Sequence, residues 1–218
     1  MSTGSNQEYQ HIDHGFDPVV DGCSRVLVLG SFPSVLSRAN AFYYGNPLNR
    51  FWRVMAACLD ESVPPNEGEL MVPSMRAGDA LTCGRDVLPG CMAASSKACP
   101  PAEPSQAVTL EMSIAYKRDL LLRHGIALWD VIESCDIKGS SDASIKNVVP
   151  VAIERVLEQA RIQAVLCNGG TAGRLYRRYL QERVGLPAEV LPSTSPANAA
   201  WSLERLIDRW REALGPLL

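Results

Sequence analysis

Short apolar runs recur along the chain at a spacing that predicts buried strands. They occupy residues 25–29, 125–129 and 163–167, and a weaker run occupies 188–191. Continuous runs of β-forming residues of this length are typical of strands that are covered on both faces. The pattern therefore predicts four parallel strands.

Between and after these runs, apolar residues follow a helical period. The segments concerned are 51–59, about 113–124, 149–160, 171–183 and 201–214. Strands that alternate with helices are typical of an α/β protein in which a parallel sheet is covered on both faces. The predicted fold class is therefore α/β.

Residues 61–107 break this alternation. The segment contains seven prolines and many small residues, which disfavour regular helices and strands. A chain of 218 residues can bury one sizeable core. We expect a single domain over residues 1–218, with an irregular surface insertion at about 61–107 that carries no chemistry.

The composition argues against a membrane-spanning protein and against a disulfide scaffold. No run of about 18 uncharged apolar residues is present, and the first 17 residues are polar. Seven cysteines are an odd number, and Cys23, Cys58, Cys135 and Cys167 lie in or beside apolar runs, as free thiols do. We expect a monomeric intracellular protein, in the cytoplasm or the nucleus.

Three further cysteines recur at a spacing of eight, at positions 83, 91 and 99. None belongs to a Cys-x-x-Cys pair, and no fourth ligand lies nearby in the sequence. We therefore expect neither a metal site nor a cofactor.

The net charge of −3 provides no overall basic field for nucleic acid. Arginines nevertheless gather in two places, 38–53 and 174–183. The first group is Arg38, Arg50 and Arg53, and the second is Arg174, Arg177, Arg178 and Arg183. These groups either face DNA or lie on solvated helix faces.

Ligands of parallel sheets bind beyond the carboxyl ends of the strands. Four such ends are rich in small or polar residues: 30–34 (Gly-Ser-Phe-Pro-Ser), Asp130 with 134–141, 168–170 (Asn-Gly-Gly) and 192–198 (Pro-Ser-Thr-Ser-Pro-Ala-Asn). Taken singly, three of the four have a plain alternative. The first is an ordinary strand-to-helix turn, the third a weak glycine turn and the last a helix cap.

A longer motif, Tyr-Tyr-Gly-Asn-Pro-Leu-Asn-Arg-Phe-Trp at 43–52, follows the first strand end. Together with 30–34, 125–135, 166–170 and 191–199, it resembles the uracil-DNA glycosylase superfamily, most closely the hypoxanthine-DNA (deoxyinosine) glycosylases. The resemblance covers nearly the whole chain outside the insertion. It implies a three-layer α/β/α sandwich with a central four-stranded parallel sheet, and a DNA repair enzyme that hydrolyses the N-glycosidic bond of a deaminated base.

The first motif departs from the superfamily pattern in its catalytic position. Many members carry Asn or Asp there to position the attacking water, whereas this chain has Ser31, Phe32 and Ser34. The resemblance to the deoxyinosine branch implies a catalytic amide slightly downstream. Asn49 is the preferred candidate, and Asn46 is the second choice. Asn49 could instead cap the helix that follows it.

The resemblance also implies residues that hold an extruded base. Tyr44, with Tyr43 in reserve, is the expected stacking platform, although a core aromatic is the alternative. An ionised Asp130 could accept a hydrogen bond from N1–H of hypoxanthine, a proton that adenine lacks. Asp130 could instead support another residue or cap a turn. Phe32 and Asn168 complete the expected base-binding set.

DNA is the expected partner, gripped through hydroxyl and backbone N–H groups at two strand ends. The candidates are Ser31, Pro33, Ser34, Ser193, Thr194, Ser195 and Asn198. The motifs contain no lysine that could form a Schiff base, so we expect a monofunctional glycosylase. The alternatives are a uracil or mismatch-specific uracil/thymine glycosylase and a non-catalytic Rossmann-like nucleotide-binding module.

Overall fold

The structure, a computed structural model, describes residues 8–64 and 108–218. Its central sheet has four parallel strands in the order β3-β2-β6-β7. These strands are β2 (Val26–Gly30), β3 (Ile126–Asp130), β6 (Ala164–Asn168) and β7 (Ala188–Leu191). The predicted parallel sheet is confirmed, with each strand within a residue or two of its expected place.

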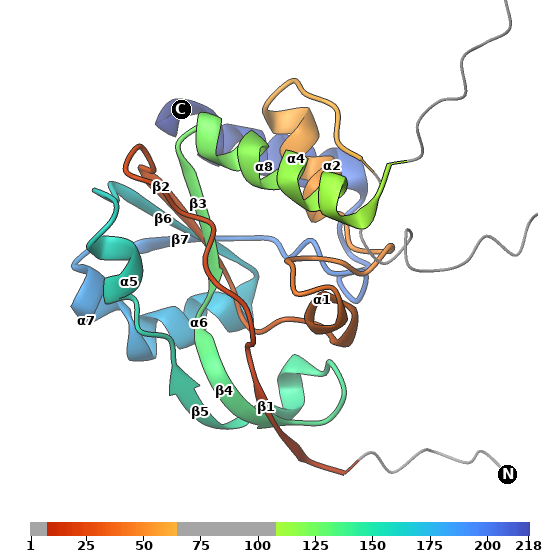
Figure 1. Cartoon of the computed structure of the whole chain (residues 1–218), viewed down its shortest axis with the longest axis vertical. Helices are drawn as coiled ribbons and strands as arrows, with labels where there is room; N and C mark the ends of the chain where they lie inside the picture. The colour runs from red at the N-terminus through yellow and green to blue at the C-terminus, as the bar shows by residue number, and fades with distance from the viewer. Residues whose placement is uncertain (1–7, 65–107) are drawn as a thin grey trace, which may run out of the picture.

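Helices cover both faces of this sheet, as an α/β/α sandwich requires (Figure 1). One group comprises α2 (Phe51–Cys58), α4 (Leu110–Arg123) and α8 (Leu203–Leu214), with α2 packed against α8. The opposite group comprises α5 (Glu154–Leu157), α6 (Gly170–Tyr179) and α7 (Gln181–Val184). The short helix α1 (Val35–Ala39) and the 3₁₀ turns at 142–144 and 215–217 complete the helical elements.

The core lies between the sheet and its helices. Strands β2 and β3 are buried at every position, which explains their continuous apolar runs. The register pairs Gly30 with Asp130 and Asn168 with Leu191. The polar residues at the strand ends therefore share one edge of the sheet.

A second sheet, which the sequence pattern does not predict, extends from that edge. It is antiparallel, with the order β1-β4-β5, and comprises β1 (Gln10–Asp13), β4 (Ile132–Ile137) and β5 (Lys146–Pro150). Strand β4 begins two residues after β3 ends, so the first half of the expected loop at 134–141 is strand. Shifts in the β4–β5 register disturb the alternation by which a strand is recognised.

The helix predicted over 149–160 is wrong in its first half. Val149 pairs with Ser134 in the second sheet, and only Glu154–Leu157 is α-helical. Apolar residues at 149, 153, 156 and 157 imitate a helical period, but Val149 lies on an exposed strand. The segment predicted as one helix over 171–183 is divided into α6 and α7 at Leu180.

Most of the expected insertion, residues 65–107 with Cys83, Cys91 and Cys99, lies outside the described residues. Residues 61–64 have no regular secondary structure. The other four cysteines are free thiols. Within the described ranges, no helix has the length and apolar character needed to cross a membrane.

Candidate active site

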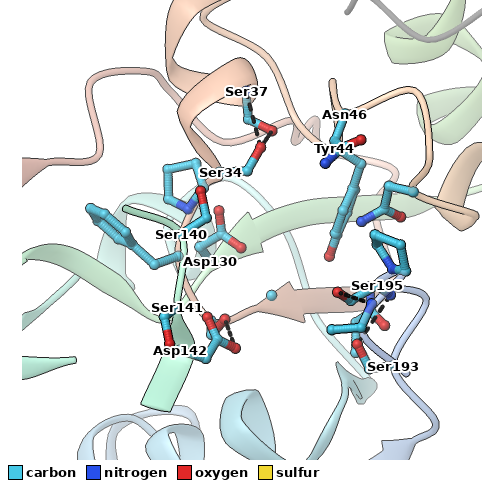
Figure 2. Close-up of a pocket in the computed structure, with 18 of the residues that line it drawn as sticks. Ser34, Ser37, Tyr44, Asn46, Asp130, Ser140, Ser141, Asp142, Ser193 and Ser195 are labelled. Carbon is cyan, nitrogen blue, oxygen red and sulfur yellow. Dashed lines mark hydrogen bonds between the residues drawn. The ribbon is translucent and has the colours of Figure 1, made fainter. Parts of the chain in front are cut away.

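A cavity of about 630 Å³ opens at the carboxyl edge of the parallel sheet (Figure 2). Its volume lies in the range of small-molecule and base pockets. All four predicted strand ends contribute to its lining, which comprises residues 30–34, Ser37, Tyr43, Tyr44, Asn46, Asn49, Asp130, Ile137, 140–143, Asn168, Ser193 and 195–198. The three groups expected around one base, Tyr44, Asp130 and Asn49, therefore line the same cavity.

The absence of a side chain at Gly30 creates the space in which two polar groups meet. A Cβ atom there would lie 2.0 Å from Oδ1 of Asp130 and 3.0 Å from the hydroxyl of Tyr44. Any larger residue would displace the Asp130 carboxyl. The glycine that ends β2 therefore has a steric role in the site.

Tyr44 presents one ring face and a buried hydroxyl to this site. Its other face stacks on Phe51, with the centroids 4.0 Å apart and the planes at 24°. Among the described residues, no partner meets the hydroxyl in good hydrogen-bond geometry, although the Asn168 side chain is close enough to act on its pKa. Burial raises the pKa of Tyr44, and the nearby Asp130 carboxyl raises this pKa further. The phenol is therefore a neutral potential donor.

Tyr43, the reserve stacking residue, belongs mainly to the core. It is 2% exposed, and its hydroxyl donates to the Asp17 carbonyl at 2.9 Å. Phe32 also borders the cavity and is 9% exposed. The structure thus offers Tyr44 as the more accessible of the two tyrosines.

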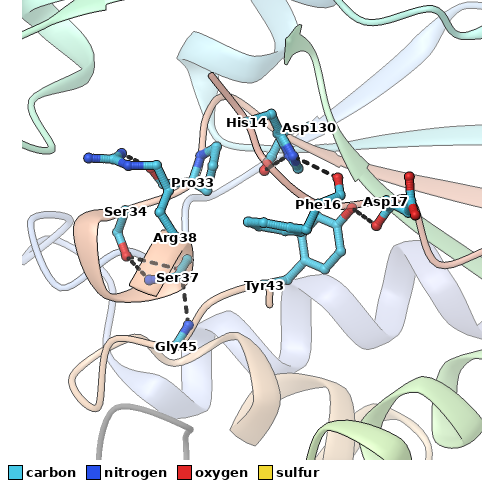
Figure 3. Close-up of polar contacts among 10 residues, drawn as sticks. All are labelled: His14, Phe16, Asp17, Pro33, Ser34, Ser37, Arg38, Tyr43, Gly45 and Asp130. Carbon is cyan, nitrogen blue, oxygen red and sulfur yellow. Dashed lines mark hydrogen bonds and ion pairs between the residues drawn. The ribbon is translucent and has the colours of Figure 1, made fainter. Parts of the chain in front are cut away.

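Asp130 is held by a histidine that sequence reasoning missed (Figure 3). Nε2 of His14 lies 3.0 Å from Oδ2 of Asp130, and Nδ1 of His14 lies 2.9 Å from the Phe16 carbonyl. The backbone N–H of His14 donates to the carbonyl of Glu133, in β4. No local motif marks His14, because its position depends on the pairing of β1 with β4.

The two candidate catalytic amides have different local contacts. Oδ1 of Asn49 accepts from the Phe51 N–H at 2.9 Å and from the Thr194 hydroxyl at 3.0 Å. Asn49 thus accepts the first N–H of α2, although the N-cap position itself is Arg50, and Asn49 also borders the cavity. Oδ1 of Asn46 accepts from the Leu48 N–H at 2.9 Å, within a tight turn.

Asn168 is fastened to the loop after β7. Its Oδ1 accepts from the Thr194 N–H at 2.9 Å, and its Nδ2 donates to the Thr194 hydroxyl at 2.9 Å. The Thr194 side chain is fully buried. The Thr194 side chain therefore holds the amides of Asn168 and Asn49 in place and does not itself contact DNA phosphate in this arrangement.

The other phosphate candidates take part in turns around the cavity. Ser34 caps α1 by accepting from the Ser37 N–H at 3.2 Å. Ser193 accepts from the Ser195 N–H at 3.2 Å, and Nδ2 of Asn198 donates to the Ser193 carbonyl at 2.9 Å. These bonds shape the loops and leave Ser193 and Ser195 on the cavity wall.

A second carboxyl, Asp142, enters the site from the turn after β4. The Ser31 hydroxyl donates to it at 2.8 Å, so Ser31 is already engaged. Although the Asp142 residue as a whole is exposed, its carboxyl lies against the cavity wall, where burial raises its pKa. Only the tertiary structure brings this residue to Ser31.

The arginines have structural contacts of their own. The Arg50 guanidinium donates to the carbonyls of Ser195 at 2.7 Å and Asn198 at 3.1 Å, and it also reaches those of Thr194 and Trp201. Arg50 thereby clasps the 193–201 loop to the start of α2. In the second arginine group, Arg183 pairs with Glu154.

Fold and site together define a class of α/β protein with one polar and aromatic pocket at the strand ends. No family model matches the chain. It is 26% identical over 196 residues to a hypoxanthine DNA glycosylase of Methanosarcina acetivorans, which covers 89% of this chain and 93% of the relative. It is 27% identical over 202 residues to a hypoxanthine DNA glycosylase of Methanosarcina barkeri, with coverages of 91% and 96%.

A solved structure shows the same architecture. It is the solution NMR structure of a candidate uracil DNA glycosylase from Methanosarcina acetivorans. The two chains superpose with a TM-score of 0.62 at 25% identity, over 95% of this chain and 99% of the other. These similarities confirm the resemblance to the uracil-DNA glycosylase superfamily, hypoxanthine type, that the motifs predict.

Proposed function

We propose that this chain is a DNA repair glycosylase that hydrolyses the N-glycosidic bond of a deaminated base in DNA, with hypoxanthine as its main substrate. One observation carries the proposal. The ring face of Tyr44, the carboxyl of Asp130 and the amides of Asn49 and Asn46 border a single base-sized cavity at the strand ends. The similarity to hypoxanthine DNA glycosylases over about nine tenths of the chain supports it.

Base recognition requires that the nucleotide be rotated out of the DNA stack. In the proposed complex, the base stacks on the face of Tyr44 that Phe51 leaves open. Oδ1 of Asp130 accepts from N1–H of hypoxanthine. Adenine has no such proton and would leave Oδ1 of the buried carboxyl without a donor from the base, which costs binding energy.

Bond cleavage places positive charge on the sugar and negative charge on the departing base, so catalysis is mainly electrostatic. An amide carbonyl is sufficient to orient the attacking water, and Asn49 is the first candidate, with Asn46 the second. In the free protein, two donors already point at Oδ1 of Asn49. Water binding at this atom would replace one of these contacts when DNA enters.

The proposed enzyme binds the DNA backbone at two strand-end loops and cleaves only the N-glycosidic bond. The backbone is gripped by the 30–34 and 192–198 loops, with Ser193 and Ser195 on the cavity wall. Among the described residues that line the cavity there is no lysine that could attack the sugar. We therefore propose a monofunctional enzyme that leaves an intact abasic site, and we propose separately that it acts as a monomer.

Uracil is the second candidate substrate, because the solved structural neighbour is a candidate uracil DNA glycosylase. An excision assay on both bases distinguishes the two substrates.

The test is an excision panel with the full chain and labelled duplexes that contain inosine, uracil, xanthine or a thymine–guanine pair. Matched duplexes with adenine or guanine are the controls. Strand breakage of the inosine duplex only after alkali treatment supports a monofunctional hypoxanthine glycosylase. Breakage without alkali would reveal a lyase, and activity confined to uracil would assign the second substrate. Nucleotide-dependent thermal stabilisation without any excision would favour the non-catalytic binding module.

A further inference from the structure

The contact between His14 and Asp130 joins two almost fully buried groups from distant parts of the chain. His14 is 1% exposed and Asp130 is 4% exposed. The histidine follows β1, whereas the aspartate ends β3 and borders the cavity. A buried carboxyl needs a partner, since an isolated buried charge is strongly destabilising.

The hydrogen bonds of His14 determine how many protons the pair holds. The Phe16 carbonyl can only accept, so Nδ1 of His14 must carry a proton. Nε2 faces a carboxyl oxygen at 3.0 Å, so a proton must also lie between these two atoms. This shared proton is held either by His14, as an imidazolium beside a carboxylate, or by Asp130, as a carboxylic acid beside a neutral imidazole. In both cases the pair has no net charge.

We propose that His14 is a positioning residue for base excision: it holds Asp130 by Oδ2 and neutralises the carboxyl whose Oδ1 faces the base. The inference rests on the proposed function of the same cavity. It assigns to His14 a role exerted through Asp130, without contact between His14 and the DNA.

Orientation is the first part of this role. With Oδ2 held by His14, Oδ1 lies over Gly30, close to the Tyr44 hydroxyl. The Asp130 carboxyl thus presents a fixed acceptor to the cavity. A carboxyl that is free to rotate would lose part of this preorganisation.

Charge is the second part. A departing purine acquires negative charge, and a bare carboxylate at hydrogen-bond distance would oppose that change in a site of low dielectric. Aromatic rings surround His14: its centroid lies 4.3 Å from that of Phe16, 5.9 Å from Tyr43 and 6.4 Å from Phe32. The one other acid of the described cavity lining, Asp142, adds negative charge. Among the described residues that line the cavity or contact the pair, His14 is therefore the group placed to neutralise Asp130.

A double-mutant cycle separates this role from a structural one. The variants are His14→Gln, which can donate a hydrogen bond but carries no charge, Asp130→Asn, and the two combined. His11→Gln is the matched control, because His11 lies 2.8 Å from Asp136 in an exposed pair outside the cavity. Single-turnover excision of hypoxanthine, DNA affinity and thermal stability are measured for each.

We expect His14→Gln to slow excision on the order of 10²-fold, with DNA affinity little changed, as when a preorganised charge-stabilising group is lost. In the Asp130→Asn background, His14→Gln should change the rate by less than about twofold, because residues that act as a unit are not additive. His11→Gln should retain the wild-type rate. If His14→Gln does not fold, His14→Asn takes its place.

Independent losses in the cycle, or a wild-type rate for His14→Gln, overturn the role of His14. A ¹⁵N NMR spectrum of the ring provides a readout that needs no substrate. Protonation of both nitrogens, or of Nδ1 alone, supports the neutral pair, and a neutral ring protonated at Nε2 alone overturns it. If the wild-type chain releases no base from any duplex, the proposed function fails as well. Wild-type activity that is insensitive to His14 removes only this inference.

Discussion

The hydroxyl of Thr194 donates a hydrogen bond to Oδ1 of Asn49 across 3.0 Å, and the same hydroxyl accepts one from Nδ2 of Asn168 at 2.9 Å. Two side-chain amides that border the cavity are thus fixed by one buried threonine from the loop after β7. The sequence motif assigns Thr194 to the DNA grip, whereas these contacts assign its side chain to the support of the amides.

Thr194→Val should therefore impair excision by loss of alignment. Valine keeps the shape but leaves the Asn168 N–H and the Asn49 carbonyl without this partner, at a cost of about 1–3 kcal/mol in stability. We expect at least about a tenfold slower single-turnover rate, in line with a displaced catalytic group. Chemical denaturation and excision assays measure the two effects. Thr194→Ser, which keeps the hydroxyl, is the control, and equal behaviour of the two variants would contradict the prediction.

The catalytic amide can be identified by two single substitutions. Asn49→Ala should abolish excision while DNA binding stays near normal, because only the orientation of the attacking water is lost. It should also lower stability by about 0.5–2 kcal/mol, since Oδ1 of Asn49 accepts the Phe51 N–H at the start of α2. The measurements are single-turnover kinetics, a DNA-binding titration and a thermal melt. Activity that survives Asn49→Ala but disappears in Asn46→Ala would exchange the two assignments.

Asp130→Asn tests base recognition. We expect it to weaken hypoxanthine excision more than uracil excision, because the carboxyl is assigned to N1–H of the purine. A mismatched polar contact of this kind costs about 1–3 kcal/mol, or roughly 5- to 150-fold in rate. Parallel assays on inosine and uracil duplexes provide the ratio. Equal losses on both substrates would remove Asp130 from base recognition.

Gly169 and the adjacent Gly170 form a matched pair for a test of backbone geometry. Gly169 has φ +103°, and a Cβ atom there would lie 2.9 Å from Cβ of Ser193. Gly169→Ala should therefore lower stability by about 1–3 kcal/mol and reduce activity, because Ser193 must shift. A Cβ at Gly170 contacts nothing within 4 Å, so Gly170→Ala should be neutral or slightly stabilising within α6. Thermal melts compare the melting temperatures of the two variants, and equal melting temperatures would refute the steric account.

The Asp142 carboxyl should make stability depend on pH in a defined direction. Its pKa is raised by burial, so its charged form is disfavoured in the folded protein relative to the unfolded chain. The resulting destabilisation is present at neutral pH and disappears as the pH falls below the unfolded value, where both states are protonated. Asp142→Asn should raise the melting temperature at pH 7, and the gain should vanish in acid. Melts across this pH range test the sign, and a constant difference would contradict it.

Local patterns were sufficient for the central sheet. Continuous apolar runs identify β2, β3 and β6 because strands buried on both faces admit almost no polar residue. The polar segments at their ends identify the rim of the cavity, since parallel strands bring their carboxyl ends to one edge. The placement of Tyr44, Asp130 and Asn49 around one cavity follows from this rule.

The second sheet could not be predicted in the same way. Val149 belongs to an exposed strand whose apolar residues match a helical period, and the β4–β5 ladder is irregular. In such segments, pairing with a distant strand determines the conformation, and the local sequence does not encode the partner. The helix predicted across Val149 is wrong for this reason.

By itself, the amino-acid sequence determined the parallel sheet, the edge at which ligands collect and the resemblance to DNA glycosylases. Only the tertiary structure decided which side chains meet there: His14 beside Asp130, Thr194 between two amides, and Asp142 beside Ser31. The reason is physical. Burial and periodicity act along the chain and leave a local signature, whereas a hydrogen bond between residues more than a hundred positions apart depends on how whole elements pack.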